Sequence, residues 1–134
     1  MFERILTISG KPGLYRLLSS GRNMFIVEMV DASKKRLPVH NSDKVVMLDD
    51  IAIYTDTEEV PLRGVFAKIY EKENGVLPFD LKMVTPEEMV EYFESVMPDY
   101  DRERVYLTHI KKMYQWYNIL VANDIVDFDA EPAE

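Results

Sequence analysis

Residues 24–30 read Met24-Phe25-Ile26-Val27-Glu28-Met29-Val30, and this stretch decides the fold of the first half of the chain. It is rich in residues that favour β-strands, and turn residues bound it on both sides, at 19–23 and 31–34. We therefore expect a β-strand here, joined to its neighbours by short polar turns.

Similar short apolar runs lie on both sides of this strand. We expect further strands at residues 5–8, 14–18, 35–39, 45–48 and 51–55. Pro12-Gly13 suits the centre of a type II turn, and Pro38 predicts an edge strand because proline has no N–H for the sheet. Turns about every 8–12 residues favour a small antiparallel barrel, and residues 1–60 have the size of an SH3-like β-barrel.

The chain changes character near Val60, because apolar residues then recur at helical spacing. Pro61 suits the first residue of a helix, and Asn74-Gly75 would end it. Thr85-Pro86-Glu87-Glu88 is a capping box that predicts the start of a second helix, which Pro98 would stop.

A third helix is expected from Asp101 or Arg102 to about Asn123. Its apolar residues fill an arc of about 200°, although one buried face needs only a little over 100°. The helix must therefore be covered on two sides, either by the other helices and the barrel or by a second protomer. His109 lies in this arc and is expected to be packed or at an interface. The overall prediction is an α+β protein with an SH3-like β-barrel module at 1–60, a three-helix module at 61–124 and an acidic tail at 125–134.

The composition excludes several classes of protein. The chain of 134 residues has no cysteine, which removes disulfides and thiol catalysis, and it shows no apolar run long enough for a membrane span. The formal net charge is −8, and residues 61–134 carry 15 acidic and 8 basic side chains. This acidity argues against a broad nucleic-acid footprint and fits a cytoplasmic protein without membrane contact.

The usual catalytic and metal-binding patterns are incomplete. Ser9-Gly10-Lys11 lacks the rest of a phosphate loop, and the acids at 99–103 lack the glycine and glutamate of a calcium loop. His40 and His109 are the only imidazoles, and no serine has the context of a nucleophile. We expect no cofactor and no enzymatic activity.

Two sets of residues remain as candidate binding sites. Tyr114, Trp116 and Tyr117 place three aromatic rings in one helical turn, which suits either a core or a contact with a protein partner or a second copy. The other set is the one basic cluster, which has the residues to hold RNA or single-stranded DNA or simply to protect an edge strand. Its members are Arg16, Arg22, Lys34, Lys35 and Arg36.

Several motifs together resemble a family of small bacterial proteins whose domains have unknown function. They are Ile8-Ser9-Gly10-Lys11-Pro12-Gly13-Leu14-Tyr15, Ile51-Ala52-Ile53-Tyr54-Thr55, Glu59-Val60-Pro61-Leu62-Arg63, Tyr100-Asp101-Arg102-Glu103-Arg104-Val105-Tyr106 and Ile110-Lys111-Lys112-Met113-Tyr114-Gln115-Trp116-Tyr117. The resemblance implies an N-terminal β module, a C-terminal helical module and a bacterial cytoplasmic protein. It implies no activity. The sequence thus favours a non-enzymatic binding or adaptor protein that acts through protein contacts, with nucleic-acid binding by the β module as the alternative.

Overall fold

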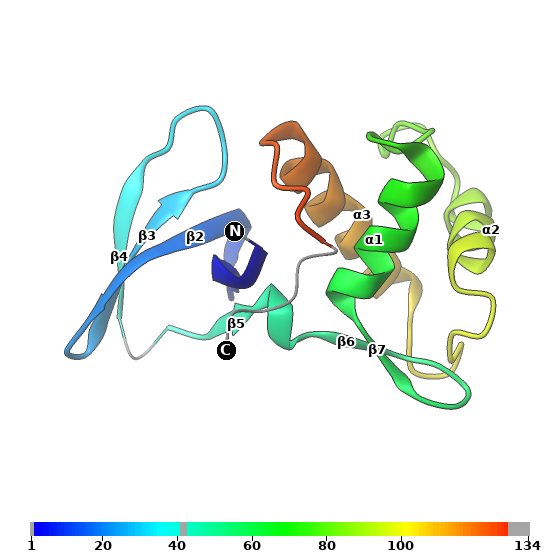
Figure 1. The fold of residues 1–134 in the computed structure, drawn as a ribbon, viewed down its shortest axis with the longest axis horizontal. Helices are drawn as coiled ribbons and strands as arrows, with labels where there is room; N and C mark the ends of the chain where they lie inside the picture. The colour runs from blue at the N-terminus through cyan, green and yellow to red at the C-terminus, as the bar shows by residue number, and fades with distance from the viewer. Residues whose placement is uncertain (1, 41–42, 129–134) are drawn as a thin grey trace.

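The structure, a computed structural model, describes residues 2–40 and 43–128 and has the expected α+β composition (Figure 1). Within these residues, seven strands precede three α-helices. The β elements and the two short 3₁₀ helices are η1 (Phe2–Arg4), β1 (Ile5–Ile8), β2 (Lys11–Gly21), β3 (Met24–Met29), β4 (Arg36–His40), β5 (Val45–Met47), η2 (Leu48–Asp50), β6 (Ala52–Tyr54) and β7 (Glu59–Pro61). The helices are α1 (Leu62–Glu73), α2 (Pro86–Val96) and α3 (Leu107–Ala122).

The first five strands form one antiparallel sheet in the order β4-β3-β2-β1-β5. β4, which contains Pro38, lies at an edge as the sequence predicts. The hairpin does not turn at Pro12-Gly13 as predicted, because Ile8 pairs with Lys11 and the chain reverses at Ser9 and Gly10. Gly13, now within β2, does have the positive φ that the prediction required, 83°. Gly10 has a φ of 85°, at which a residue with a side chain would be strained. This two-residue turn therefore depends on glycine.

The sheet is strongly curved but is not a closed barrel. A flat sheet of five strands would hold its two edges about 19 Å apart. Here the Asp43 N–H donates to the His40 carbonyl oxygen at 2.9 Å, and β5 begins only two residues later, so the edges come closer than a flat sheet allows. Among the described residues β4 and β5 do not pair, so the predicted closed barrel is not confirmed.

Residues 51–55 do not join this sheet, so that part of the barrel prediction is wrong. β6 pairs with β7 in a separate two-stranded sheet, and Thr55 forms an antiparallel bridge with Tyr100. The Asp101 N–H also donates to the Tyr54 carbonyl oxygen at 2.9 Å. Residues near 100 are therefore held as an extended neighbour of β6. The division of the chain into modules at residue 60 stays a prediction.

These contacts explain why α3 begins later than expected. The sequence predicts its start at Asp101 or Arg102, but the first helical residue is Leu107. The bonds to β6 hold residues 99–101 outside the helix, and a turn follows them. The other helices agree more closely. Thr85 and Glu88 form the predicted capping box of α2, and Asn74 ends α1 in the left-handed conformation. Pro61 is the N-cap of α1 instead of its first residue.

The described residues form two hydrophobic clusters. The larger one joins the three helices, η1, η2 and the segment after α3, and it is rich in aromatic rings. Phe2 and Phe128 meet edge to face in it at 5.9 Å between ring centroids, and the Phe2 N–H donates to the Asp127 carboxylate at 3.2 Å. The smaller cluster lies on one face of the curved sheet. Its buried members are Leu6, Ile8, Tyr15, Val27 and Val39.

Candidate binding groove beside Trp116

The three aromatic rings of α3 have different surroundings. Tyr114 and Tyr117 are completely buried. The Tyr114 hydroxyl donates to the Met89 carbonyl oxygen at 2.7 Å, and the Tyr117 hydroxyl donates to the carbonyl oxygen of Gly75. Burial raises the pKa of both phenols, to about 12 for Tyr117. Both rings belong to the helical core, and only Trp116 is partly exposed.

The wide apolar arc of α3 is covered within the chain on its tyrosine side. Phe79 and Tyr92 pack against Tyr114, with ring centroids 5.3 and 5.9 Å away, while Phe66 and Phe128 pack against Tyr117. The other two helices and their connections thus cover this side, and cover of the other side by a second protomer stays a prediction. Trp116 lies outside this cover.

Trp116 borders an apolar hollow of about 280 Å³ between β6 and α3. The apolar residues that line it come from β6, from the residues next to it and from the C-terminal part of the chain. They are Ile51, Ala52, Ile53, Tyr54, Val105, Met113 and Trp116. Because Ile53, Val105 and Met113 are themselves buried, their side chains form a fixed floor and do not have to rearrange to expose it.

A second hollow, of about 420 Å³, lies beside the first. It is lined by the β1–β2 turn, by Thr7 at the end of β1, and by Gln115 and Ile119 of α3. Trp116 and Lys112 line both hollows, so they form the ridge between them. Val46 pairs with Thr7 across two strands, and its side chain therefore lies on the same sheet face, where it is 46% exposed. We call the two hollows and this ridge the Trp116 groove.

The charged side chains on the Trp116 groove are all basic. Lys11, Arg104 and Lys112 line it, and no acidic side chain of the described residues does. The Arg104 guanidinium lies 5.0 Å from the centre of the Tyr54 ring and 3.5 Å from the Asp101 carboxylate, which lies outside both hollows. A chain with a net charge of −8 thus carries a locally basic groove with an apolar floor.

His109 borders the groove in a role that the sequence did not predict. It is exposed and not packed in the core, and its Nδ1 accepts a hydrogen bond from the Tyr106 backbone N–H at 3.1 Å. The two rings lie 5.3 Å apart at 31°. His109 therefore caps the start of α3. His40, the other imidazole, is exposed at the end of β4.

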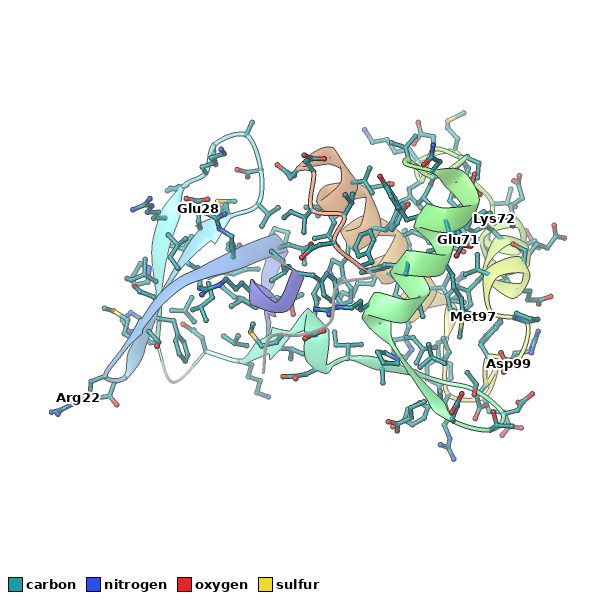
Figure 2. The ribbon with its side chains drawn as sticks, viewed as in Figure 1. Arg22, Glu28, Glu71, Lys72, Met97 and Asp99 are labelled. Atoms are coloured by element: carbon teal, nitrogen blue, oxygen red, sulfur yellow. The ribbon has the colours of Figure 1, made fainter. Side chains whose placement is uncertain are left out.

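The predicted basic cluster is divided in the structure. Arg16 and Arg36 both lie against the Glu28 carboxylate, at 3.1 and 3.6 Å, in register across β2, β3 and β4. Lys34 and Lys35 are exposed in the β3–β4 turn. Arg22 lies in the β2–β3 turn, at the opposite end of β3, and Figure 2 shows it at the outer tip of the hairpin, away from Glu28. The structure thus brings together Arg16 and Arg36, but not Arg22.

The part of the chain that the structure describes shows neither a metal site nor a membrane-spanning helix. No group of three or more acidic or histidine side chains there has the geometry to hold a metal ion. None of the three helices has both the length and the apolar character that crossing a bilayer requires.

Sequence reasoning missed most of the groove. The signals it had were Trp116 and the Ser9–Gly13 turn, which it interpreted separately. It had no means to predict that the hairpin turn would lie against α3, since that contact depends on how the sheet packs on the helices. Arg104 and Tyr54 were equally hidden, because the bridge between Thr55 and Tyr100 brings them together.

Comparisons with known proteins agree with the motifs. The family model described as Domain of unknown function (DUF6852) matches residues 51–120, and the model described as Domain of unknown function (DUF5606) matches residues 2–48. A protein from Bacteroides vulgatus, solved by solution NMR, is 53% identical to the chain. The alignment covers 96% of this chain and 91% of that chain, with a TM-score of 0.78. No curated protein matches the chain.

Proposed function

Because the chain belongs to the DUF6852 family of domains of unknown function, as its motifs suggested, we propose its function from its surface: a non-enzymatic binding module that holds a protein partner in the Trp116 groove. The observation that carries the proposal is Trp116 itself. It is the single tryptophan of the chain, it is partly exposed, and it stands between two hollows. Tryptophan and arginine beside a desolvated pocket are the residues that most often dominate the energy of protein contacts.

The surroundings of Trp116 support a protein partner. Tyr54 and Val46, both more than 40% exposed, add apolar surface beside the groove. Exposed apolar surface next to a preformed hollow is typical of an interaction site, whereas single exposed apolar residues elsewhere on a surface need no explanation. We place the protein in the cytoplasm as part of the same proposal.

The test is capture of partners from native lysate with the full chain and with Trp116→Ala. We expect protein partners that survive nuclease treatment and are lost from Trp116→Ala. Arg22→Glu is the matched control, because Arg22 lies at the far tip of the β2–β3 hairpin, and it should retain the same partners. Equal capture by Trp116→Ala would contradict the proposal.

The alternative function is binding of RNA or single-stranded DNA through Arg16, Arg22, Lys34, Lys35 and Arg36. Glu28 weakens this alternative, because its carboxylate already pairs with two of the five cations, Arg16 and Arg36. Binding by this surface should fall steeply with salt and should be lost on charge reversal of Lys34 and Lys35. Nuclease-sensitive partners in the capture experiment would favour this alternative.

We also propose that the curved sheet is an open form of the predicted SH3-like barrel. Its size, its five antiparallel strands and the closeness of its edges support this. Amide hydrogen exchange tests it, since free edges leave the outward N–H groups of β4 and β5 unprotected. Strong protection at both edges would indicate a closed barrel instead.

A further inference from the structure

We propose that the Trp116 groove takes an acidic peptide segment of a partner protein, which places one apolar side chain against Trp116 and its carboxylates on Lys11, Arg104 and Lys112. The inference rests on the proposed function and adds the chemistry of the partner. It follows from four properties of the groove: its charge, the spacing of its residues on α3, its size and its ring faces.

The charge of the groove selects an acidic partner. Most of the negative charge of the chain lies in residues 61–134, yet the charged side chains that line the groove are cations. Charges farther away than about 8 Å are largely screened at physiological salt, so the cations of the groove decide which ligand is attracted. Asp101 offsets part of the charge of Arg104, which leaves Lys11 and Lys112 as the main cations. A basic peptide would meet these cations directly and would be rejected.

The spacing of residues on α3 places the cation Lys112 next to the apolar side chains of Met113 and Trp116. His109, Met113 and Trp116 follow one another at three- and four-residue steps, and Lys112 precedes Trp116 by four residues. Residues at this spacing lie on the same helix face. An apolar side chain seated between Met113 and Trp116 would therefore have the Lys112 ammonium within reach of a carboxylate one or two residues away.

The size of the apolar hollow fits a side chain better than a cofactor. Its volume of about 280 Å³ lies just below the roughly 300–1,000 Å³ of small-molecule sites. Its floor of Ile53, Val105 and Met113 offers no side-chain groups to hydrogen-bond a polar ligand. Since a cavity of about 150 Å³ already holds a benzene ring, one phenylalanine side chain would occupy about half of this space, with its backbone at the basic rim.

The exposed ring faces favour a peptide over a nucleic acid. Binding of single strands relies on aromatic faces on which successive bases stack. Arg104 already lies over the Tyr54 ring, at 5.0 Å from its centre, so this face is occupied. Trp116 alone does not form a stacking platform for a strand.

The test uses the fluorescence of Trp116, since it is the single tryptophan of the chain. The probe is a synthetic seven-residue peptide of glutamate and aspartate with one central phenylalanine. Two matched peptides replace the phenylalanine by alanine or every acid by lysine. We expect a saturable fluorescence change with the first peptide, binding at least about tenfold weaker with the alanine peptide, and none with the lysine peptide.

Variants connect the binding to the groove. Lys112→Glu and Arg104→Glu should each weaken binding of the acidic peptide by about tenfold, and higher salt should weaken it further. Arg22→Glu is the control and should bind as the unchanged chain does. Circular dichroism confirms that each variant is folded. Equal binding of the acidic and lysine peptides, or no loss with Lys112→Glu, would overturn the inference.

Two other occupants are outcomes of the same experiments. An oligothymidine that changes the Trp116 fluorescence more strongly than the peptide would assign the groove to nucleic acid and overturn the inference. A second copy is the other, because Pro86, Val90 and Leu107 form an apolar hollow beside Glu87 and Glu91 on the same chain. If light scattering shows dimers or larger species, and Lys112→Glu dissociates them, then the groove holds a second copy and the inference is overturned.

The proposed function and this inference fail in different ways. If Trp116→Ala captures the same partners as the unchanged chain, the proposed function fails. If Trp116→Ala loses its partners but the acidic peptide does not displace them from the unchanged chain, the groove binds protein of another chemistry. Only the inference then fails.

Discussion

The two sides of α3 use the same kinds of residue for different purposes. On one side Tyr114 and Tyr117 are completely buried, and each hydroxyl donates to a backbone carbonyl. On the other side Trp116 is partly exposed between two hollows with a basic rim. The apolar arc of α3 is wider than one buried face needs, and it therefore includes both core residues and surface residues. Only their burial distinguishes the two kinds.

The largest expected effect comes from the tyrosine side. Tyr117→Ala removes a buried ring that packs on Phe66 and Phe128, and it should lower the free energy of unfolding by about 3–5 kcal/mol. Urea unfolding followed by circular dichroism measures this loss. A loss below about 1 kcal/mol would mean that the tyrosine side does not carry the core.

Trp116→Ala should lower the free energy of unfolding by only about 1–2 kcal/mol, because part of this ring is already in water. The same urea experiment gives the value, and Trp116→Phe serves as the control that keeps most of the packing. If Trp116→Ala destabilises the protein as much as Tyr117→Ala, the distinction between the two sides of α3 is lost.

Tyr117→Phe removes only the hydroxyl and should cost about 1 kcal/mol at neutral pH. Burial raises the pKa of Tyr117 to about 12 from an ordinary value near 10. A raised pKa contributes stability below pH 10 that is lost as the pH rises toward 12, because the unfolded phenol ionises first. The unchanged chain should therefore lose stability over this window more steeply than Tyr117→Phe. Equal slopes between pH 10 and 12 would contradict the burial of this hydroxyl.

The smallest effect is expected for the basic rim of the groove. Lys112 is exposed, so Lys112→Glu should change the free energy of unfolding by less than about 0.5 kcal/mol. Thermal unfolding in parallel with the unchanged chain checks this. A larger loss would mean that Lys112 supports the fold, and its use as a probe of binding would then be compromised.

Local signals in the sequence predicted the elements that depend on local chemistry. Thr85-Pro86 marked the start of α2, and the turn residues around 24–30 marked β3. The start of α3 was misplaced because residues near Asp101 are held by bonds to Tyr54, about 47 positions earlier in the chain. Such a long-range bond leaves no local signal.

The candidate site was predictable only in part, for the same reason. A helical wheel placed Tyr114, Trp116 and Tyr117 on one wide arc, but it did not show which of them the chain itself would cover. That depends on Phe79 and Phe128, which lie in irregular segments outside the three helices. The closure of the sheet depends on contacts across β4 and β5, which strand spacing does not specify.

The contact between Phe2 and Phe128 also has a consequence for the order of folding. These two rings meet in the centre of the aromatic cluster, and the Phe2 N–H bonds to Asp127, 125 positions away. During synthesis Phe2 is made long before Phe128, so Phe2 lacks this contact until the chain reaches residue 128. The curved sheet has its own cluster and is free to form early, whereas the helical core is complete only when residue 128 has been made. The packing of Phe2 against Phe128 should therefore be among the last contacts to form when this chain folds.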